Sequence, residues 1–284
     1  LHPRKARRPI KWLSRKIEEP VFVLSSRAPG NRGHFLTEHL PRLVACRDFL
    51  RAHGVVKILV TPGHRRWQVD YLKKLDIPES DVLEASYGAV FCPSAYFVPV
   101  LCEGIQTTIS IKSDYTLIRD LFLVDCQPSS SRRPIFLSRK DAPDRQLINE
   151  DTIFQIVKDY FPSVRRVTLS SLSLDEQIEL FQNASLVIGP HSQAFRNVLF
   201  CKDALIIQLL QGFRNAKNEY YHWALNYCAI ATINNNRCLN LFNEMPFYKN
   251  SNWIYPEEKL KKDLEHLTCL INFGCEGQTN GYLV

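Results

Sequence analysis

Residues 186–197 read Leu-Val-Ile-Gly-Pro-His-Ser-Gln-Ala-Phe-Arg-Asn, and this stretch decides the expected fold. The apolar run predicts a buried strand, the Gly-Pro pair a tight turn, and the small polar residues after it the start of a helix. Such a helix start presents free backbone N–H groups and a positive dipole end at the carboxyl edge of the sheet. Nucleotides bind at that edge in open α/β sheets, so we expect a ligand site around His191. The alternative is a loop in which His191 only caps the helix.

The segments on either side continue an alternation of strands and helices, which predicts two consecutive α/β units with parallel sheets. Apolar runs predict strands, and apolar residues at helical spacing predict helices, one of which is kinked or restarted at Pro41. In the latter half, strands are expected at 135–137, 164–169, 186–188 and 204–210, and helices at 149–160, 173–183 and 256–273. In the first half, strands are expected at 21–24, 56–60 and within 81–96, and helices at 34–51, 67–75 and 113–125.

A linker is expected between the two units. Residues 127–134 are polar, flanked by proline and without periodicity. The 284 residues of the chain suffice for two domains of ordinary size. We therefore expect an N-terminal domain at 1–126, a linker at 127–134, a second α/β domain at 135–255, and a C-terminal helix and tail at 256–284.

The net charge of +7 comes largely from a basic arm at residues 1–16. The chain has neither zinc-finger spacing nor an aromatic ribonucleoprotein motif, so we expect no nucleic-acid partner. A solvated arm that touches an anionic membrane surface is the favoured interpretation, and nucleic-acid binding the alternative.

The nine cysteines are odd in number and form no C-x-x-C pair. Several lie in apolar runs, where cysteine behaves as a small buried hydrophobe. This usage favours a reducing compartment without a disulfide framework. No apolar run reaches 18 residues, so a spanning helix is not expected. We expect a cytoplasmic protein, and a peripheral membrane contact is the alternative. The sequence does not begin with Met, so a membrane anchor upstream of residue 1 is left as an open alternative.

A second candidate site follows the strand at 135–137. Arg139, Lys140 and Arg145 come directly after it, at the carboxyl edge. Guanidinium groups bind phosphate oxygens in pairs, which predicts a diphosphate clamp. The alternative is an ordinary charged loop in which Asp141 and Asp144 pair with these bases.

A third candidate lies in the Gly-Asn-Arg-Gly-His-Phe-Leu-Thr-Glu-His-Leu-Pro-Arg segment at 30–42. His34 and Glu38 are four residues apart and share one helical face. A carboxylate held against an imidazole forms a workable general base. The alternative is a half-buried pair with a structural role. No third ligand has zinc spacing and no D-x-D motif occurs, so we expect neither a metal nor another cofactor.

In their order along residues 20–235, these segments resemble glycosyltransferase family 61. The family pattern G-N-x-x-H-W-x-x-D/E-x-L-P-R-L corresponds to residues 30–43, the serine–arginine strand end to Ser138-Arg139, and the N-E-D helix start to 149–151. Residues 189–200 correspond to the family signature, roughly G-x-H-G-A-G-L-T-N-L-L-F, and residues 220–224 to its tyrosine-rich helix start. The departures are Ser192, Gln193, Ala194 and Arg196 in the signature, and Gln208 where many members have glutamate.

The resemblance implies a GT-B-type fold, with two Rossmann-like domains facing a cleft and the donor held by the C-terminal domain. It implies inverting transfer of a sugar, xylose or N-acetylglucosamine, from a nucleotide-diphosphate donor such as a UDP-sugar to a glycan or polysaccharide hydroxyl. Alternatives are a non-catalytic nucleotide-sugar-binding module and a basic nucleic-acid-binding α/β protein. The implied base is Glu38, oriented by His34, with Asn31 and Arg42 on the acceptor side. The implied donor-binding residues are Arg139, Arg145, Glu150, His191, Ser192, Gln193 and Asn197.

Overall fold

The structure is a computed structural model, in which contacts divide the chain into two compact units. The first contains the described residues up to 98 together with 112–122, and the second begins at Leu123. Most of the basic arm at 1–16 and all of the segment at 220–224 lie outside the described residues. The described residues are 15–24, 30–60, 63, 65–84, 90–98, 112–124, 131–211, 227–243 and 252–272.

The first unit is built on a parallel sheet of four strands in the order β4-β3-β2-β6. The first of these strands, β2, lies between β3 and β6, so the winding of the chain reverses between β2 and β6. A crevice opens at the carboxyl ends of strands where such a reversal occurs. The strands are β2 Val21–Val23, β3 Lys57–Val60, β4 Val82–Glu84 and β6 Ala95–Tyr96; β1 Arg15–Lys16 and β5 Val90–Phe91 form a separate parallel pair.

The helix predicted at 34–51 is interrupted next to Pro41, as expected, because a new helical segment begins at Leu40, one residue before the proline. The helix widens to a π-helical turn before the proline and breaks again at Cys46. Pro41 fits because it stands in the first turn of α2, where its missing N–H leaves no bond unmade. The helices of this unit are α1 Arg32–His34, the π-helix η2 Phe35–His39, α2 Leu40–Ala45, α3 Arg47–Ala52, α4 Arg65–Lys73, the 3-10 helix η3 Glu79–Asp81 and α5 Lys112–Leu123.

The second unit has a parallel sheet of five strands in the order β11-β10-β9-β7-β8. Its winding reverses between β7 and β9, which pair directly. The sequence predicted four of these strands and missed β11. The strands are β7 Arg133–Leu137, β8 Arg165–Val167, β9 Ala184–Pro190, β10 Leu205–Gln211 and β11 Arg237–Asn243.

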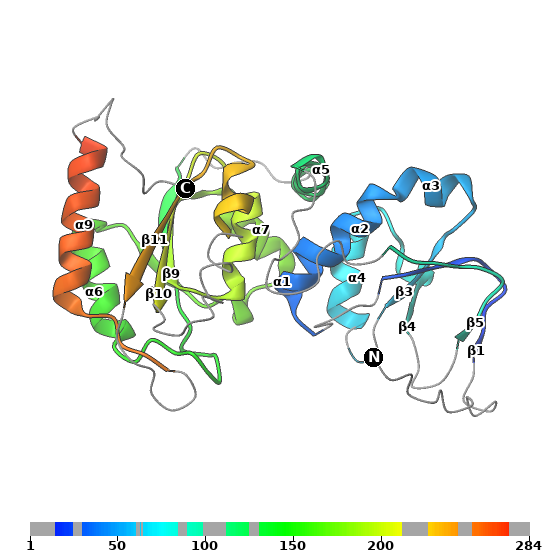
Figure 1. The fold of residues 1–284 in the computed structure, drawn as a ribbon, viewed down its shortest axis with the longest axis horizontal. Coiled ribbons are helices and arrows are strands. Elements are labelled where there is room, and N and C mark those ends of the chain that lie inside the picture. The colour runs from blue at the N-terminus through cyan, green and yellow to red at the C-terminus, as the bar shows by residue number, and fades with distance from the viewer. Residues whose placement is uncertain are drawn as a thin grey trace, which may run out of the picture. The chain divides into compact units, whose positions relative to one another are not determined.

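Helices cover both faces of this sheet, with α6 and α9 on one side and α7 on the other (Figure 1). The core between the sheet and α6–α9 joins Phe136 and Ile188 to Ile153 and Leu260. The predicted α-helix after β9 is a 3-10 helix, which corrects its expected type. The helices are α6 Glu150–Tyr160, the 3-10 helix η4 Leu169–Ser171, α7 Leu174–Gln182, the 3-10 helix η5 Gln193–Phe200 and α9 Glu257–Asn272; residues 227–232 are also helical.

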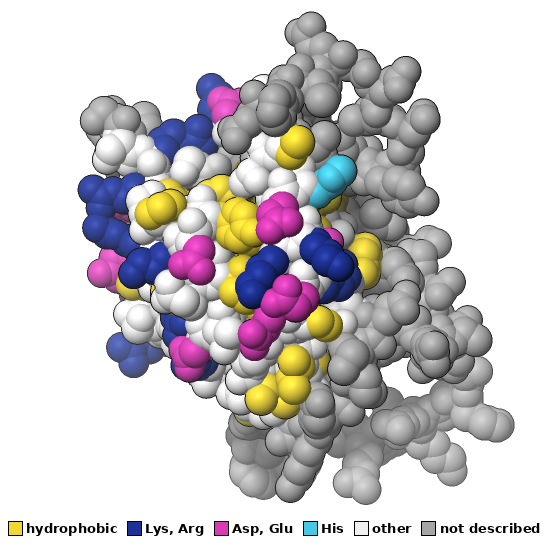
Figure 2. Space-filling view, turned by 90° about the vertical axis from the view of Figure 1, so that its left-hand side faces the viewer, with side chains coloured by type: hydrophobic (Ala, Val, Ile, Leu, Met, Phe, Trp, Pro, Cys, Tyr) yellow, Lys and Arg dark blue, Asp and Glu magenta, His cyan; other side chains and the backbone are white. Residues whose placement is uncertain are grey.

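The solvent side of α6 and α9 carries acidic and basic side chains interspersed with scattered hydrophobic ones (Figure 2). Within the described ranges, none of the helices has both the length and the apolar character needed to cross a bilayer. The cysteines found to be free thiols there are Cys46, Cys92, Cys201, Cys228, Cys238 and Cys269.

Gly189 allows β9 to approach β7 closely at the reversal of the winding. A Cβ atom at this position would lie 2.5 Å from the carbonyl oxygen of Leu137 and 3.1 Å from its nitrogen. Both atoms belong to the backbone of the neighbouring strand and have little freedom to move. Glycine at 189 is therefore required by the spacing of the two strands that carry the loops at 138–145 and 191–193.

We expect Gly189→Ala to lower the free energy of unfolding by about 1–3 kcal/mol, the usual cost of forcing extra volume into a packed interior. Urea denaturation followed by circular dichroism measures this change. Ser185→Ala, in the half-buried part of the same strand, is the matched control and should change stability little. Equal stability of Gly189→Ala and the wild type would contradict the close approach of β9 and β7.

Candidate functional site

The loops that follow β7 and β9 bring together three of the predicted donor-binding residues. Arg139 and Arg145 lie in the loop after β7, and His191 follows β9 directly. Arg196 lies over the Tyr227 ring on which His191 stacks, and the positive charges of Arg145, Arg139 and Arg196 lower the pKa of His191. The cluster stands at the reversal between β7 and β9, where open α/β sheets bind their ligands.

Arg139 is buried, with 8% of its surface exposed, but its guanidinium is only partly bound. Nη2 donates to the carbonyl oxygen of Asp144 at 3.0 Å, with Asp144 Oδ1 at 3.4 Å. Nε is buried and has no hydrogen-bond partner among the described residues. Burial and the charge of Arg145 lower the pKa of Arg139, while Asp144 opposes this shift. A buried guanidinium with an unfilled N–H is stabilised by an anionic oxygen, as a diphosphate would supply.

Arg145 and Lys140 differ in their surroundings. Arg145 has a positive φ of 51°, which is uncommon for a residue other than glycine and is often found at functional sites. Its Nε lies 3.7 Å from Asp144 Oδ1, and its side chain is 30% exposed. Lys140 instead pairs with Asp151 at 2.6 Å on the surface. Both arginines thus pair with Asp144, as the alternative of a charged loop expected, while the lysine is bound elsewhere; the diphosphate clamp stays a prediction.

Glu150 and Asn197, predicted to bind the donor, are both buried and bonded to protein groups. The Glu150 carboxylate accepts hydrogen bonds from Ser138 Oγ at 2.5 Å and from the Arg139 backbone N–H at 2.9 Å. Asn197 Nδ2 donates to Gln177 Oε1 on α7 at 3.3 Å. Both residues therefore hold the site's loops in place, and their contact with a donor stays a prediction.

His191 is half-buried and fixed from two directions. Its Nδ1 lies 2.9 Å from Gln208 Oε1 on β10, and its ring stacks on Tyr227 with centroids 5.0 Å apart. Burial and the three arginines lower the pKa of His191 to about 4, although the bond to Gln208 opposes the shift. The ring is therefore neutral at pH 7 and supplies no positive charge to a phosphate. Ser192, which is buried, and Gln193, which is half-buried, follow it at the start of η5.

The sequence interpretation missed Arg196 and Tyr227 as members of the site. The Arg196 guanidinium lies over the Tyr227 ring at 5.8 Å from its centroid, and Tyr227 stacks on His191. Arg196 stands out in the sequence only as a departure from the family pattern. The rule that selected Arg139, a guanidinium just after a strand end, applies to Arg196 as well and would have found it.

Arg42 joins the two strand ends at the reversal in the first unit and does not face an acceptor as expected. Its guanidinium donates to the carbonyl oxygens of Leu24 at 3.1 Å, Val98 at 2.9 Å and Glu38 at 3.1 Å. Leu24 follows β2 and Val98 follows β6, and Arg42 is only 2% exposed. Burial lowers the pKa of Arg42, and the charge of Glu38 opposes this shift. Arg42 is thus a buried structural link.

His34 and Glu38 form the pair that the sequence predicts. His34 Nδ1 and Glu38 Oε1 are hydrogen-bonded, and the two side chains are 17% and 11% exposed. The Asn31 side chain, expected on the acceptor side, caps α1 by accepting from the His34 backbone N–H at 3.1 Å. On α5, Tyr115 Oη donates to the Thr37 carbonyl at 2.8 Å and ties that helix to the π-helical turn. The pair therefore stands at the carboxyl end of β2 on a restrained turn.

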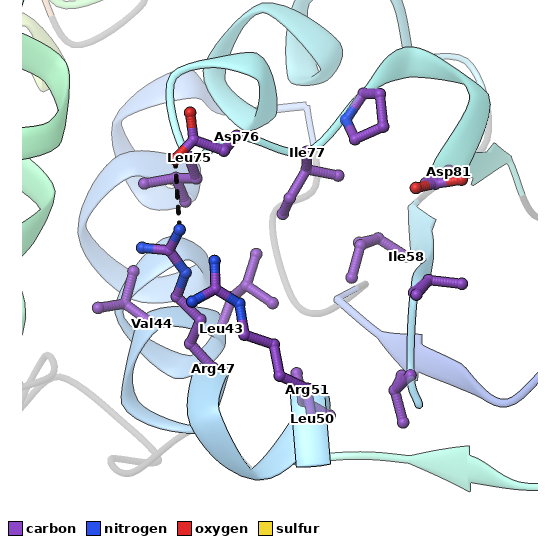
Figure 3. A pocket seen from close by; sticks show the side chains of 13 residues that line it. Leu43, Val44, Arg47, Leu50, Arg51, Ile58, Leu75, Asp76, Ile77 and Asp81 are labelled. Atoms are coloured by element: carbon purple, nitrogen blue, oxygen red, sulfur yellow. Dashed lines mark hydrogen bonds and ion pairs between the residues drawn. The ribbon is translucent and has the colours of Figure 1, made fainter. Parts of the chain in front are cut away.

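A cavity of about 160 Å³ in the first unit lies at the opposite ends of its strands (Figure 3). Its walls are mostly apolar side chains of α2, α3 and the segments that enter β3 and β4, such as Leu43, Ile58 and Ile77. Arg47 and Asp76 form an ion pair of 3.3 Å at its side. Because this cavity opens at the amino ends of β3 and β4, it is distinct from the His34–Glu38 pair.

Three or more His, Cys, Asp or Glu side chains placed to hold a metal ion do not occur together among the residues that the structure describes. The charged groups described above at the ends of β7 and β9 are chiefly guanidinium groups. Such groups bind phosphate oxygens directly through paired N–H donors.

Comparisons with known proteins give similar solved structures and one family. The chain is similar to a structure of E. coli heptosyltransferase WaaC with ADP-2-deoxy-2-fluoro heptose, with 10% sequence identity and a TM-score of 0.36 over 90% of this chain and 100% of that one. A search of curated proteins gave no match. The family model described as Glycosyltransferase 61 matches residues 33–207, more than half of the 284 residues. The chain therefore belongs to glycosyltransferase family 61.

Proposed function

We propose that this glycosyltransferase is an inverting enzyme that binds a UDP-sugar at the carboxyl ends of β7 and β9. The observation that carries the proposal is that Arg139 and Arg145 follow β7 while His191 and Arg196 follow the adjacent strand β9, at the reversal of the sheet. Two phosphate groups present several anionic oxygens, and guanidinium forks match them in pairs. The sugar is xylose or N-acetylglucosamine, and the acceptor is a hydroxyl of a glycan or polysaccharide.

The arginines stabilise the leaving diphosphate. As the bond between the anomeric carbon and the diphosphate oxygen breaks, the electron pair stays on that oxygen and negative charge develops there. Fixed positive groups that meet developing charge usually supply the largest part of catalysis. Arg139 supports this role, because its buried Nε has an open hydrogen-bonding position. Arginine charge would then serve where other glycosyltransferases use a metal ion, so no cofactor is needed.

The His34–Glu38 pair activates the acceptor. We assign the base to His34 and the orienting role to Glu38, which reverses the roles suggested by the family resemblance. Histidine is the side chain that most often serves as a general base, and a carboxylate bound to one ring nitrogen holds the imidazole in place. The imidazole takes the proton of the acceptor hydroxyl. The acceptor oxygen attacks the anomeric carbon as the diphosphate departs, which inverts that carbon.

Arg139→Ala should raise the dissociation constant of UDP by about 10- to 100-fold, the range for a hydrogen bond to a charged group. Isothermal titration calorimetry measures it. The control is Arg165→Ala, which removes an exposed arginine from the edge strand β8 and should leave UDP binding unchanged. Unaltered UDP affinity in a folded Arg139→Ala protein would remove Arg139 from the donor site.

His34→Ala and Glu38→Gln should both lower kcat for sugar transfer, His34→Ala by about 10²- to 10⁴-fold, because a positioned base contributes that much. Their affinity for UDP should stay at the wild-type value. Release of UDP from UDP-xylose and from UDP-N-acetylglucosamine with a panel of xylan and glycan oligosaccharides measures transfer. His53→Ala, which removes an exposed histidine, is the matched control. Transfer at the wild-type rate by His34→Ala would show that the base lies elsewhere.

A further inference from the structure

A chain of hydrogen bonds runs from His191 across two strands of the second sheet. His191 Nδ1 lies 2.9 Å from Gln208 Oε1, and Gln208 Nε2 donates to Asn240 Oδ1 on β11 at 2.9 Å. Asn240 Nδ2 in turn donates to Cys228 Sγ at 3.3 Å. Gln208 is completely buried, so water does not replace any of these partners.

The direction of this chain fixes which ring nitrogen of His191 carries the proton. Each amide has one donor end and one acceptor end. The Gln208 amino group faces Asn240 Oδ1 and lies 3.8 Å from Cys238 Sγ, so its oxygen faces His191. An amide oxygen only accepts hydrogen bonds, so His191 Nδ1 must donate.

A neutral imidazole has one N–H group, and in His191 that group is bound to Gln208. The second nitrogen, Nε2, is then a bare acceptor and has no hydrogen-bond partner among the described residues. The lowered pKa of about 4 keeps a second proton off the ring at neutral pH. Stacking on Tyr227, with the two ring planes at 29°, holds the direction in which Nε2 points.

The phosphate oxygens of a nucleotide-diphosphate sugar carry no proton at neutral pH and accept hydrogen bonds only. A bare Nε2 beside them would be repelled. From this chemistry we infer that His191 accepts a hydrogen bond from an O–H or N–H group of the donor's nucleoside or sugar, and that it does not bind the diphosphate. The inference rests on the proposed donor site. In that site, the arginines bind the phosphates. The hydrogen-bond acceptor Nε2 of His191 recognises the nucleoside or the sugar attached to them.

Gln208 is the positioning residue for this acceptor. It touches no donor atom, because it is buried behind His191 in β10. Its contribution is to hold the proton on Nδ1 and so to leave Nε2 open. The chemistry at position 208 therefore sets whether the His191 ring presents an acceptor or a donor to the ligand.

The test measures binding of three probes by calorimetry: inorganic pyrophosphate, UDP and UDP-xylose. His191→Ala should leave the dissociation constant of pyrophosphate within about twofold of the wild type and raise that of UDP or UDP-xylose about 3- to 10-fold, the effect of one neutral hydrogen bond. A rise for both UDP and UDP-xylose places the recognised group on the nucleoside, and a rise for UDP-xylose alone places it on the sugar. Arg139→Ala should weaken all three probes. His266→Ala, on the exposed side of α9, is the matched control.

Two further variants separate an acceptor from a donor at position 191. His191→Gln retains a side-chain acceptor and should recover part of the UDP or UDP-xylose affinity. His191→Lys offers N–H donors and no acceptor, so it should not recover that affinity. Recovery by lysine, or loss of pyrophosphate binding in a folded His191→Ala protein, would overturn the inference while leaving the donor site in place.

Nitrogen-15 NMR of the His191 ring provides a test that needs no ligand. The expected spectrum has the proton on Nδ1, and Gln208→Leu should abolish this preference. A proton on Nε2 in the wild type would overturn the inference alone. If none of the three probes binds the wild type, the proposed donor site fails, and the inference fails with it.

Discussion

The reversal of winding between β7 and β9 is the constraint on which the second unit's site depends. In a parallel sheet all carboxyl ends share one edge, and successive connections cover the crevice except where the direction of winding changes. The loops at 138–145 and 191–193 both start at that place. Gly189 keeps the two strands in contact, since any side chain there would meet the backbone of Leu137. The arginines thus come from loops whose separation is set by two adjacent backbones.

In each unit, a buried charged side chain holds in place the strand ends at which the winding reverses, rather than a ligand. Arg42 links the ends of β2 and β6 through their carbonyl oxygens, and Glu150 holds the end of β7 through Ser138 and the Arg139 N–H. A buried ionic group stabilises only if its hydrogen bonds are satisfied, and these two groups make several bonds each. Their bonds to main-chain atoms of neighbouring segments make the positions of the nearby functional groups less variable.

Much of the fold was predictable, because apolar runs and helical spacing identify most strands and helices. Strand β11 escaped prediction because Asn240 and the polar ends of Arg237–Asn243 interrupt its apolar pattern. The site was predictable as a set of loops, including the His34–Glu38 pair and Arg139 with Arg145. The directions of Glu150, Asn197 and Arg42 were not, because a sequence shows that a group is polar but not which buried partner it meets. The choice of ring nitrogen that carries the proton in His191 likewise depends on Gln208, which is 17 residues away along the chain.

The π-helical turn at Phe35–His39 has a consequence for how this segment tolerates change. A π-turn accommodates one more residue than an α-turn, which lets Phe35 and Leu36 within it and Leu40 and Leu43 after it all lie in the core. Removing one residue would restore regular α-helical spacing and rotate everything on one side of the deletion by about 100°. Either these apolar residues would then turn away from the core, or the His34 imidazole would turn away from its present direction. Insertions and deletions should therefore be far less acceptable here than point substitutions of similar chemistry.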